Sequence, residues 1–125
     1  MKPSSISPLV RVGAAVLVLM SAQWAYAHAH PKQQTPGAGA TVGVGTTQQV
    51  SIEFDDALEG AFSSLKVTDA AGRDVTTGAS SVDANDKKHM SVALRALEPG
   101  LYTVSWVAVA ADGHRTQGHY AFTVK

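Results

Sequence analysis

The feature that most constrains the fold is a two-residue alternation of apolar and polar side chains after residue 49. In residues 50–54, valine, isoleucine and phenylalanine alternate with serine and glutamate, and residues 120–124 repeat the pattern with tyrosine, phenylalanine and valine. Successive side chains of a β-strand point to opposite faces, so this period indicates strands with one buried face. No stretch has a helical period of useful length. The pattern predicts an all-β sandwich or barrel of six or seven short strands.

Turn-forming residues separate the alternating segments, as residues 69–72 (DAAG) and 98–100 (EPG) show. Residues 101–110 are the longest strand candidate and are nearly all apolar, which predicts that both of their faces are largely covered. Trp106 is expected to pack in the core. The expected strands are 40–44, 50–54, 65–67, 73–77, 90–94, 101–110 and 116–125, with a loop at 80–88 and one helical turn at 57–63.

The first 27 residues have the composition of a cleaved secretory signal. Lys2 and Arg11 precede an apolar core at residues 12–20, and small residues follow up to Ala27. The apolar core is far shorter than the roughly 20 residues of a membrane-spanning helix. We therefore expect cleavage after Ala27, export to the periplasm, and a mature chain of residues 28–125 that forms one domain without membrane insertion.

Charge and cysteine content exclude several classes of function. The chain has 10 basic and 10 acidic residues, and loss of Lys2 and Arg11 with the signal leaves a weakly acidic domain. Nucleic-acid binding calls for a basic patch, so we expect no such partner. The chain has no cysteine, which excludes disulfides, thiolate metal sites and cysteine nucleophiles.

Cleavage after Ala27 makes His28 the first residue, and this creates a metal chelate. The free α-amine and the ring Nδ1 of one histidine can grip the same ion. Asp112-Gly113-His114 supplies a second pair of donors, because side chains two residues apart in an extended segment project to one side. The glycine between them lets a tight turn bring them together in the same way. Three nitrogens and one carboxylate oxygen in a plane favour Cu(II).

His30 leaves an alternative open at the same end of the chain. A free amine with histidine in the third position binds Cu(II) or Ni(II) through the two intervening amide nitrogens, and His28-Ala29-His30 has this spacing. Cleavage after Ala29 also fits the signal rule and makes His30 the terminal ligand instead. We favour His28. His89 and His119 are interpreted as structural residues.

Five motifs together resemble the CopC family of periplasmic copper-binding proteins, over essentially the whole of residues 28–125. They are HAHPK, TPGAGATV, SIEFDD, LEPGLYTVSW and VAADGHRTQGHYAFTVK. The resemblance implies a seven-stranded Greek-key β-sandwich, cupredoxin-like in shape. It also implies Cu(II) held by a histidine brace, which falls on His28 with Asp112 and His114. Asp56 stands where relatives often have glutamate, and it is expected to orient the amine or a ligand ring without binding the metal itself.

Some relatives carry a methionine-rich loop that binds Cu(I), whereas this chain has only Met90 after the signal. We therefore expect one Cu(II) site and no Cu(I) site. We further expect a monomeric, non-enzymatic protein that carries or buffers copper and passes it to a CopD-like inner-membrane partner. One alternative is a histidine-brace copper oxygenase. Another is a metal-free, immunoglobulin-like interaction module whose terminal histidine is accidental.

Overall fold

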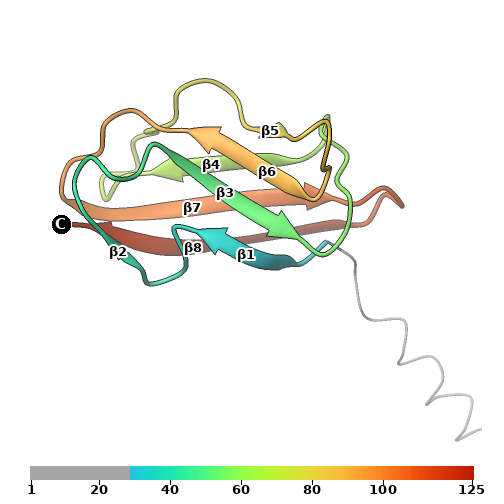
Figure 1. The fold of residues 1–125 in the computed structure, drawn as a ribbon, viewed down its shortest axis with the longest axis horizontal. Coiled ribbons are helices and arrows are strands. Elements are labelled where there is room, and N and C mark those ends of the chain that lie inside the picture. The colour runs from blue at the N-terminus through green and yellow to red at the C-terminus, as the bar shows by residue number, and fades with distance from the viewer. Residues whose placement is uncertain (1–28) are drawn as a thin grey trace, which may run out of the picture.

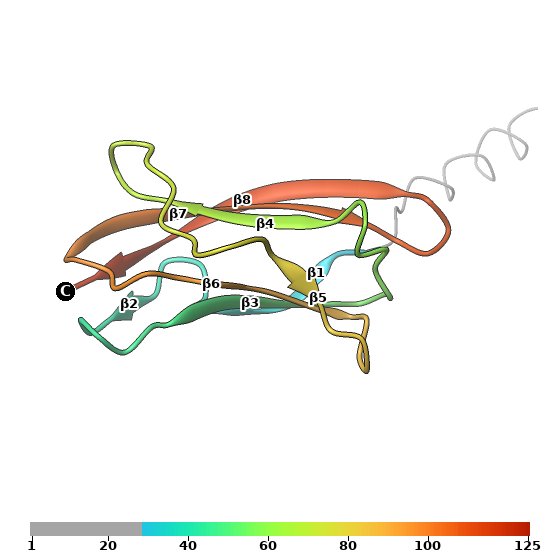
Figure 2. The ribbon, with the colours of Figure 1, turned by 90° about the horizontal axis from the view of Figure 1, so that it is seen from above.

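The computed structural model describes residues 29–125 as two four-stranded β-sheets packed face to face (Figures 1 and 2). The predicted signal and His28 lie outside the described residues. No helix within residues 29–125 is long and apolar enough to cross a membrane. Strands that are neighbours in a sheet are mostly not consecutive in the chain, because the chain crosses between the layers as in a Greek key. The predicted all-β sandwich is confirmed.

The first sheet is antiparallel with the strand order β1-β3-β6-β5, and the second has the order β2-β8-β7-β4. In the second sheet β2 runs parallel to β8, and the other pairs are antiparallel. The strands are β1 (Pro31–Thr35), β2 (Thr41–Val42), β3 (Gln49–Phe54), β4 (Ser64–Thr68), β5 (Ser81–Val82), β6 (His89–Ala93), β7 (Gly100–Val109) and β8 (Arg115–Val124).

The core lies between the two sheets and consists of the apolar members of each alternating segment. Trp106 on β7 is only 8% exposed. Its ring meets that of Phe54 on β3 edge-on, with centroids 5.4 Å apart, and so joins the two layers. The prediction that Trp106 is a core residue is confirmed. The largest fully buried side chains are Phe54, Phe122, Ile52, Met90, Val50, Val67, Val104 and Val124.

The prediction that both faces of the longest strand are largely covered is wrong. Burial along β7 alternates, with Val104 and Ala108 fully buried, whereas Ser105 is exposed and Leu101 is 52% exposed. The sandwich has only two layers, so nothing packs on the outer face of the second sheet within residues 29–125.

Three local predictions also differ from the structure. Residues 73–77 form no strand, because they pass from one sheet to the other: Asp74 bridges to Thr68 on β4, and Thr76 bridges to Leu94 just after β6. The predicted loop at residues 80–88 contains the two-residue strand β5. Residues 57–63 form a turn without a helix.

The edge strand β1 was not predicted. Its sequence, PKQQT, has no apolar alternation, and no residue of β1 is fully buried. An edge strand needs to pair on one side only, and proline at its first position is compatible with that role.

Candidate metal centre

The predicted ligands Asp112 and His114 lie in the tight loop that joins β7 to β8. The Gly113 amide donates to the Ala110 carbonyl (2.9 Å), and the Ala110 amide donates to the His114 carbonyl (2.9 Å). Gly113 has a φ of 89°, in the left-handed region that favours glycine. The loop therefore has the form of a turn closed by a left-handed residue, a common three-residue hairpin connection.

One carboxylate holds both the backbone and the ring of His114. Asp112 Oδ1 accepts the His114 amide (3.0 Å), and Asp112 Oδ2 lies 2.8 Å from His114 Nδ1. The Asp112 side chain is 42% exposed and that of His114 is 64% exposed. The turn thus presents an oriented imidazole and a carboxylate together at the surface, as the spacing predicted.

The chain enters the sandwich beside this hairpin. Ala29 is fully buried and has a φ of 73°, although it is not a glycine. Its carbonyl accepts a 2.7 Å hydrogen bond from the Thr116 hydroxyl, two residues beyond His114 on β8. This bond joins the segment before β1 in the first sheet to β8 in the second. It places the start of the described chain at the end of the sandwich that carries Asp112 and His114 (Figure 1).

Two hydrogen bonds join the backbone of His30 to the side chain and the backbone of Asp55. The His30 amide donates to Asp55 Oδ1 (2.8 Å), and the Asp55 amide donates to the His30 carbonyl (3.0 Å). These bonds continue the pairing of β1 with β3, in which Pro31 lies opposite Phe54. His30 is exposed, and its backbone conformation is set by Asp55.

Asp56 belongs to a loop that packs directly against the hairpin. Its Oδ1 accepts the Ala57 amide (2.8 Å), and its side chain is partly buried. Leu58 forms a bridge with Ala110, and the Ala111 amide donates to the Ala57 carbonyl (3.2 Å). The structure therefore brings the loop of Asp56 to the predicted site.

The remaining histidines of the described chain are placed differently. His89 pairs with Asp86, with 3.1 Å between Nε2 and Oδ2, at the start of β6. His119 is exposed on β8, opposite Ser105 of β7. Met90 is fully buried in the core.

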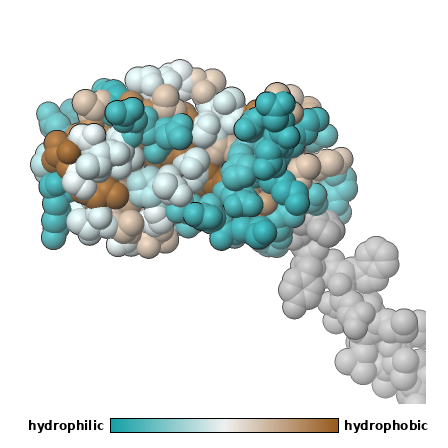
Figure 3. All heavy atoms as spheres, in the orientation of Figure 1, coloured by the Kyte–Doolittle hydropathy of each residue, from teal (hydrophilic) through white to brown (hydrophobic). Residues whose placement is uncertain are grey.

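On the face seen in Figure 3, hydrophilic side chains gather toward the end where β3 stops and β6 starts.

Within residues 29–125 no group of three or more histidine, aspartate or glutamate side chains is arranged to hold a metal ion. The predicted third and fourth donors, the amine and ring of His28, belong to a residue outside the described part of the chain. The described chain thus supplies Asp112 and His114.

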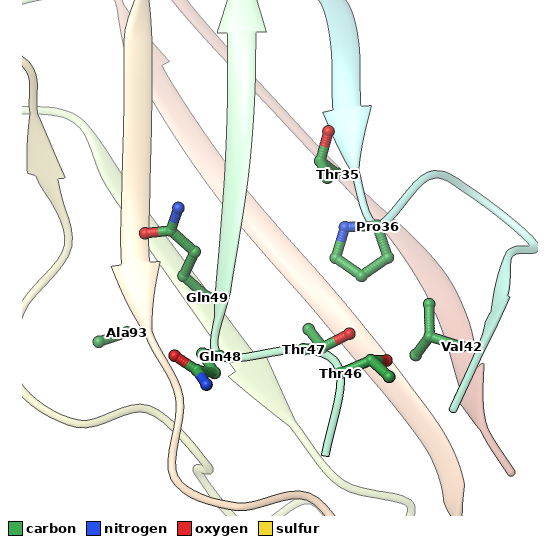
Figure 4. A pocket seen from close by; sticks show the side chains of 8 residues that line it. All are labelled: Thr35, Pro36, Val42, Thr46, Thr47, Gln48, Gln49 and Ala93. Carbon is green, nitrogen blue, oxygen red and sulfur yellow. The ribbon is translucent and has the colours of Figure 1, made fainter. Parts of the chain in front are cut away.

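A depression of about 700 Å³ lies at the opposite end of the sandwich (Figure 4). None of its lining residues is ionisable, so it offers no imidazole or carboxylate donor for a metal ion. They are Thr35, Pro36, Val42, Thr46, Thr47, Gln48, Gln49 and Ala93.

The family model for the CopC domain matches the sequence over residues 31–125. The chain belongs to the CopC family. It is similar to Protein YobA of Escherichia coli K12, with 39% identity over 101 residues that cover 80% of this chain and 81% of YobA. It is also similar to the copper transport protein CutJ of Bacillus subtilis, with 31% identity over 100 residues. That match covers 79% of this chain and only 18% of CutJ.

Solved CopC-family structures share the fold. CopC from Methylosinus trichosporium OB3b has a TM-score of 0.72 and 26% identity, over 78% of this chain and 94% of that one. PcoC, a methionine-rich copper resistance protein from Escherichia coli, has a TM-score of 0.68 and 31% identity, over 79% of this chain and all of PcoC. The CopC match includes Asp112, His114 and the loop of Asp56, and it starts after His28 and His30.

Sequence reasoning missed Thr116 and Asp55 as residues that shape this end of the fold. Thr116 stands two positions after His114, and Asp55 immediately follows the alternating segment 50–54. Neither position has a local pattern that reveals its partner, since Thr116 and Ala29 are separated by 87 positions.

Proposed function

We propose that the protein is a periplasmic Cu(II)-binding protein that carries or buffers copper. His28, as the first residue of the mature chain, contributes its amine and ring Nδ1, and Asp112 and His114 complete the ligand set. The single observation that carries the proposal is the Asp112–His114 pair, held together on the hairpin next to the anchored start of the described chain.

The spacing of the pair suits two neighbouring ligands of one ion. Asp112 Oδ2 and His114 Nδ1 are separated by 2.8 Å, a hydrogen-bond distance that keeps the carboxylate and the ring within reach of one ion. Nitrogen and carboxylate donors in a plane favour Cu(II) over the other divalent ions.

The burial of Ala29 supports cleavage before His28. A cut after Ala29 would remove a fully buried residue and the carbonyl that Thr116 binds. A cut after Ala27 keeps both contacts. It leaves His28 joined by one peptide bond to Ala29, whose carbonyl Thr116 binds.

The methionine content supports a single copper site. PcoC is described as methionine-rich, whereas Met90 is the one methionine of residues 29–125 and is fully buried. A soft Cu(I) site requires several accessible sulfur ligands. We therefore propose one Cu(II) site and no Cu(I) site.

Transfer to a CopD-like membrane partner is supported by the surface next to the hairpin. Phe62 is 70% exposed and lines a mainly apolar depression of about 470 Å³ together with Ala111 and Gly113. Exposed apolar patches commonly mark protein interaction sites. In CutJ, a copper transport protein, the segment similar to this chain makes up only 18% of the length. This is consistent with a CopC-like chain that works together with a separate copper-transporting partner.

Copper titration of the exported protein, with its N-terminus verified by mass spectrometry, tests the proposal. We expect one tightly bound Cu(II) and an electron paramagnetic resonance (EPR) spectrum of mixed nitrogen and oxygen ligation. Because His28 and His114 supply the nitrogen donors, replacing either by alanine should weaken binding by about 100-fold or more, whereas the control His119→Ala should not. Unchanged tight binding together with an unchanged EPR spectrum in His28→Ala would contradict the brace. A spectrum without site-specific copper would favour the metal-free module, and ascorbate-driven oxidation of a glycan would favour the oxygenase.

A further inference from the structure

The backbone of Ala29 and His30 is held by three hydrogen bonds that reach both sheets. The Thr116 hydroxyl on β8 donates to the Ala29 carbonyl (2.7 Å). The His30 amide donates to Asp55 Oδ1 (2.8 Å), and the Asp55 amide donates to the His30 carbonyl (3.0 Å). We call these three bonds the N-terminal latch. Ala29 is held in the left-handed region (φ 73°) that residues other than glycine rarely adopt.

A mature chain that starts with His28-Ala29-His30 has two competing ways to bind Cu(II). In the brace, the amine and ring of His28 act with His114 and Asp112. In the amide mode, the ligands are the amine, the backbone nitrogens of Ala29 and His30, and the ring of His30. Each backbone nitrogen must then release its proton to solvent before it can bind the metal.

The latch opposes the second mode directly. The His30 amide hydrogen is the one donated to Asp55 Oδ1. Once that hydrogen is lost, the carboxylate oxygen would face an anionic, metal-bound nitrogen at hydrogen-bond distance, and both atoms would be acceptors. The Thr116 bond holds the carbonyl end of this same peptide unit, and Ala29 is buried, so the segment cannot wrap around an ion without leaving the core.

We propose that the N-terminal latch selects the copper-binding mode, with Asp55 and Thr116 as positioning residues that exclude amide-nitrogen ligation and direct Cu(II) to His114. This inference rests on the proposed copper binding. A hydrogen bond to a charged group contributes enough that losing the Asp55 contact should change the ratio of the two modes roughly tenfold or more.

The test compares two disruptive variants, Asp55→Ala and Thr116→Val, with the conservative variants Asp55→Asn and Thr116→Ser. Serine keeps the hydroxyl, so Thr116→Ser should behave as the parent protein does. Asparagine keeps an oxygen acceptor but not the charge, so Asp55→Asn should fall between the parent protein and Asp55→Ala. Asp74→Ala and Thr46→Val are matched controls, because they remove the same kinds of side-chain-to-backbone bond away from the hairpin. Each exported protein is titrated with Cu(II) and separately with Ni(II).

Three readouts distinguish the modes: the EPR spectrum, the position of the visible absorption band, and the protons released per copper. We expect the disruptive variants to gain a four-nitrogen species with a band at shorter wavelength, because deprotonated amides are strong-field donors. That species should release two additional protons per ion, one from each amide. The same variants should bind Ni(II) in a diamagnetic, square-planar form.

The inference is overturned if both disruptive variants keep the parent spectrum and proton count, or if the parent protein already shows four-nitrogen ligation. Thr116→Val preserves the shape of the side chain and carries the same expectation by itself, so the test holds if Asp55→Ala does not fold. If the parent protein binds no copper at all, the proposed function fails as well. If all variants bind alike through His114, only the latch inference fails.

Discussion

Gly118 on β8 is the position where a single methyl group should be most damaging. A Cβ atom added there would lie 2.6 Å from Cζ2 and 2.9 Å from Cε2 of Trp106. The indole ring cannot easily move away, because it packs edge-on against the fully buried ring of Phe54. Gly118→Ala must therefore displace the ring or the strand.

Two opposing effects set the size of the loss. Overpacking a core side chain costs about 1–3 kcal/mol, whereas replacing glycine by alanine in a strand would otherwise stabilise the fold by about 0.5–1 kcal/mol. The clash dominates, so we expect Gly118→Ala to lower the free energy of unfolding by about 1–2 kcal/mol. In a domain of this size the melting temperature should fall by roughly 5–15 °C.

Urea unfolding followed by tryptophan fluorescence measures this directly. Trp24 belongs to the predicted signal, so Trp106 is the one tryptophan of residues 28–125 and reports on its own displacement. Gly60→Ala is the matched control, because its Cβ would lie 3.6 Å from the nearest atom of Val82, an ordinary contact. A Gly118→Ala protein as stable as the parent, with unchanged emission, would refute the proposed clash.

Two further predictions concern the site and the core. Asp112→Asn should weaken Cu(II) binding about 10–100-fold in a copper titration, with the unfolding curve unchanged, because it removes the charge of a proposed ligand that also holds the exposed ring of His114. Unchanged affinity would contradict this role. Burial raises the pKa of Tyr120 to about 12, and its hydroxyl donates to the Pro36 carbonyl (2.8 Å). The folded pKa exceeds the unfolded value near 10, so this contribution to stability is complete below pH 10 and is lost as the pH rises toward 12. Stability measured across this range should therefore fall less steeply in Tyr120→Phe.

Alternation in the sequence was sufficient to predict the buried faces of the central strands. Val50, Ile52 and Phe54 are all fully buried, as their two-residue spacing required. The hairpin with Asp112 and His114 was also predictable, because glycine between them permits the left-handed turn that the structure shows. Both inferences rest on local geometry, which a strand or a tight turn imposes on its own residues.

Segments that lack a local pattern were not predictable. Residues 73–77 looked like a strand but cross between the sheets, and β1 showed no strand pattern but pairs with β3. For both segments, pairing depends on which edge of which sheet lies alongside, and the order of strands in space is a property of the whole chain.

The sequence by itself determined the all-β class, the core faces and the residues with metal-binding chemistry, because these follow from side-chain period and donor type. The tertiary structure decided how the start of the domain is held. Thr116 binds the Ala29 carbonyl only because β8 of one sheet passes beside the segment that leads into β1 of the other. Asp55 binds the His30 amide only because β1 pairs with β3. Contacts between distant segments arise when strands pair and when the two layers pack, and no local pattern encodes them.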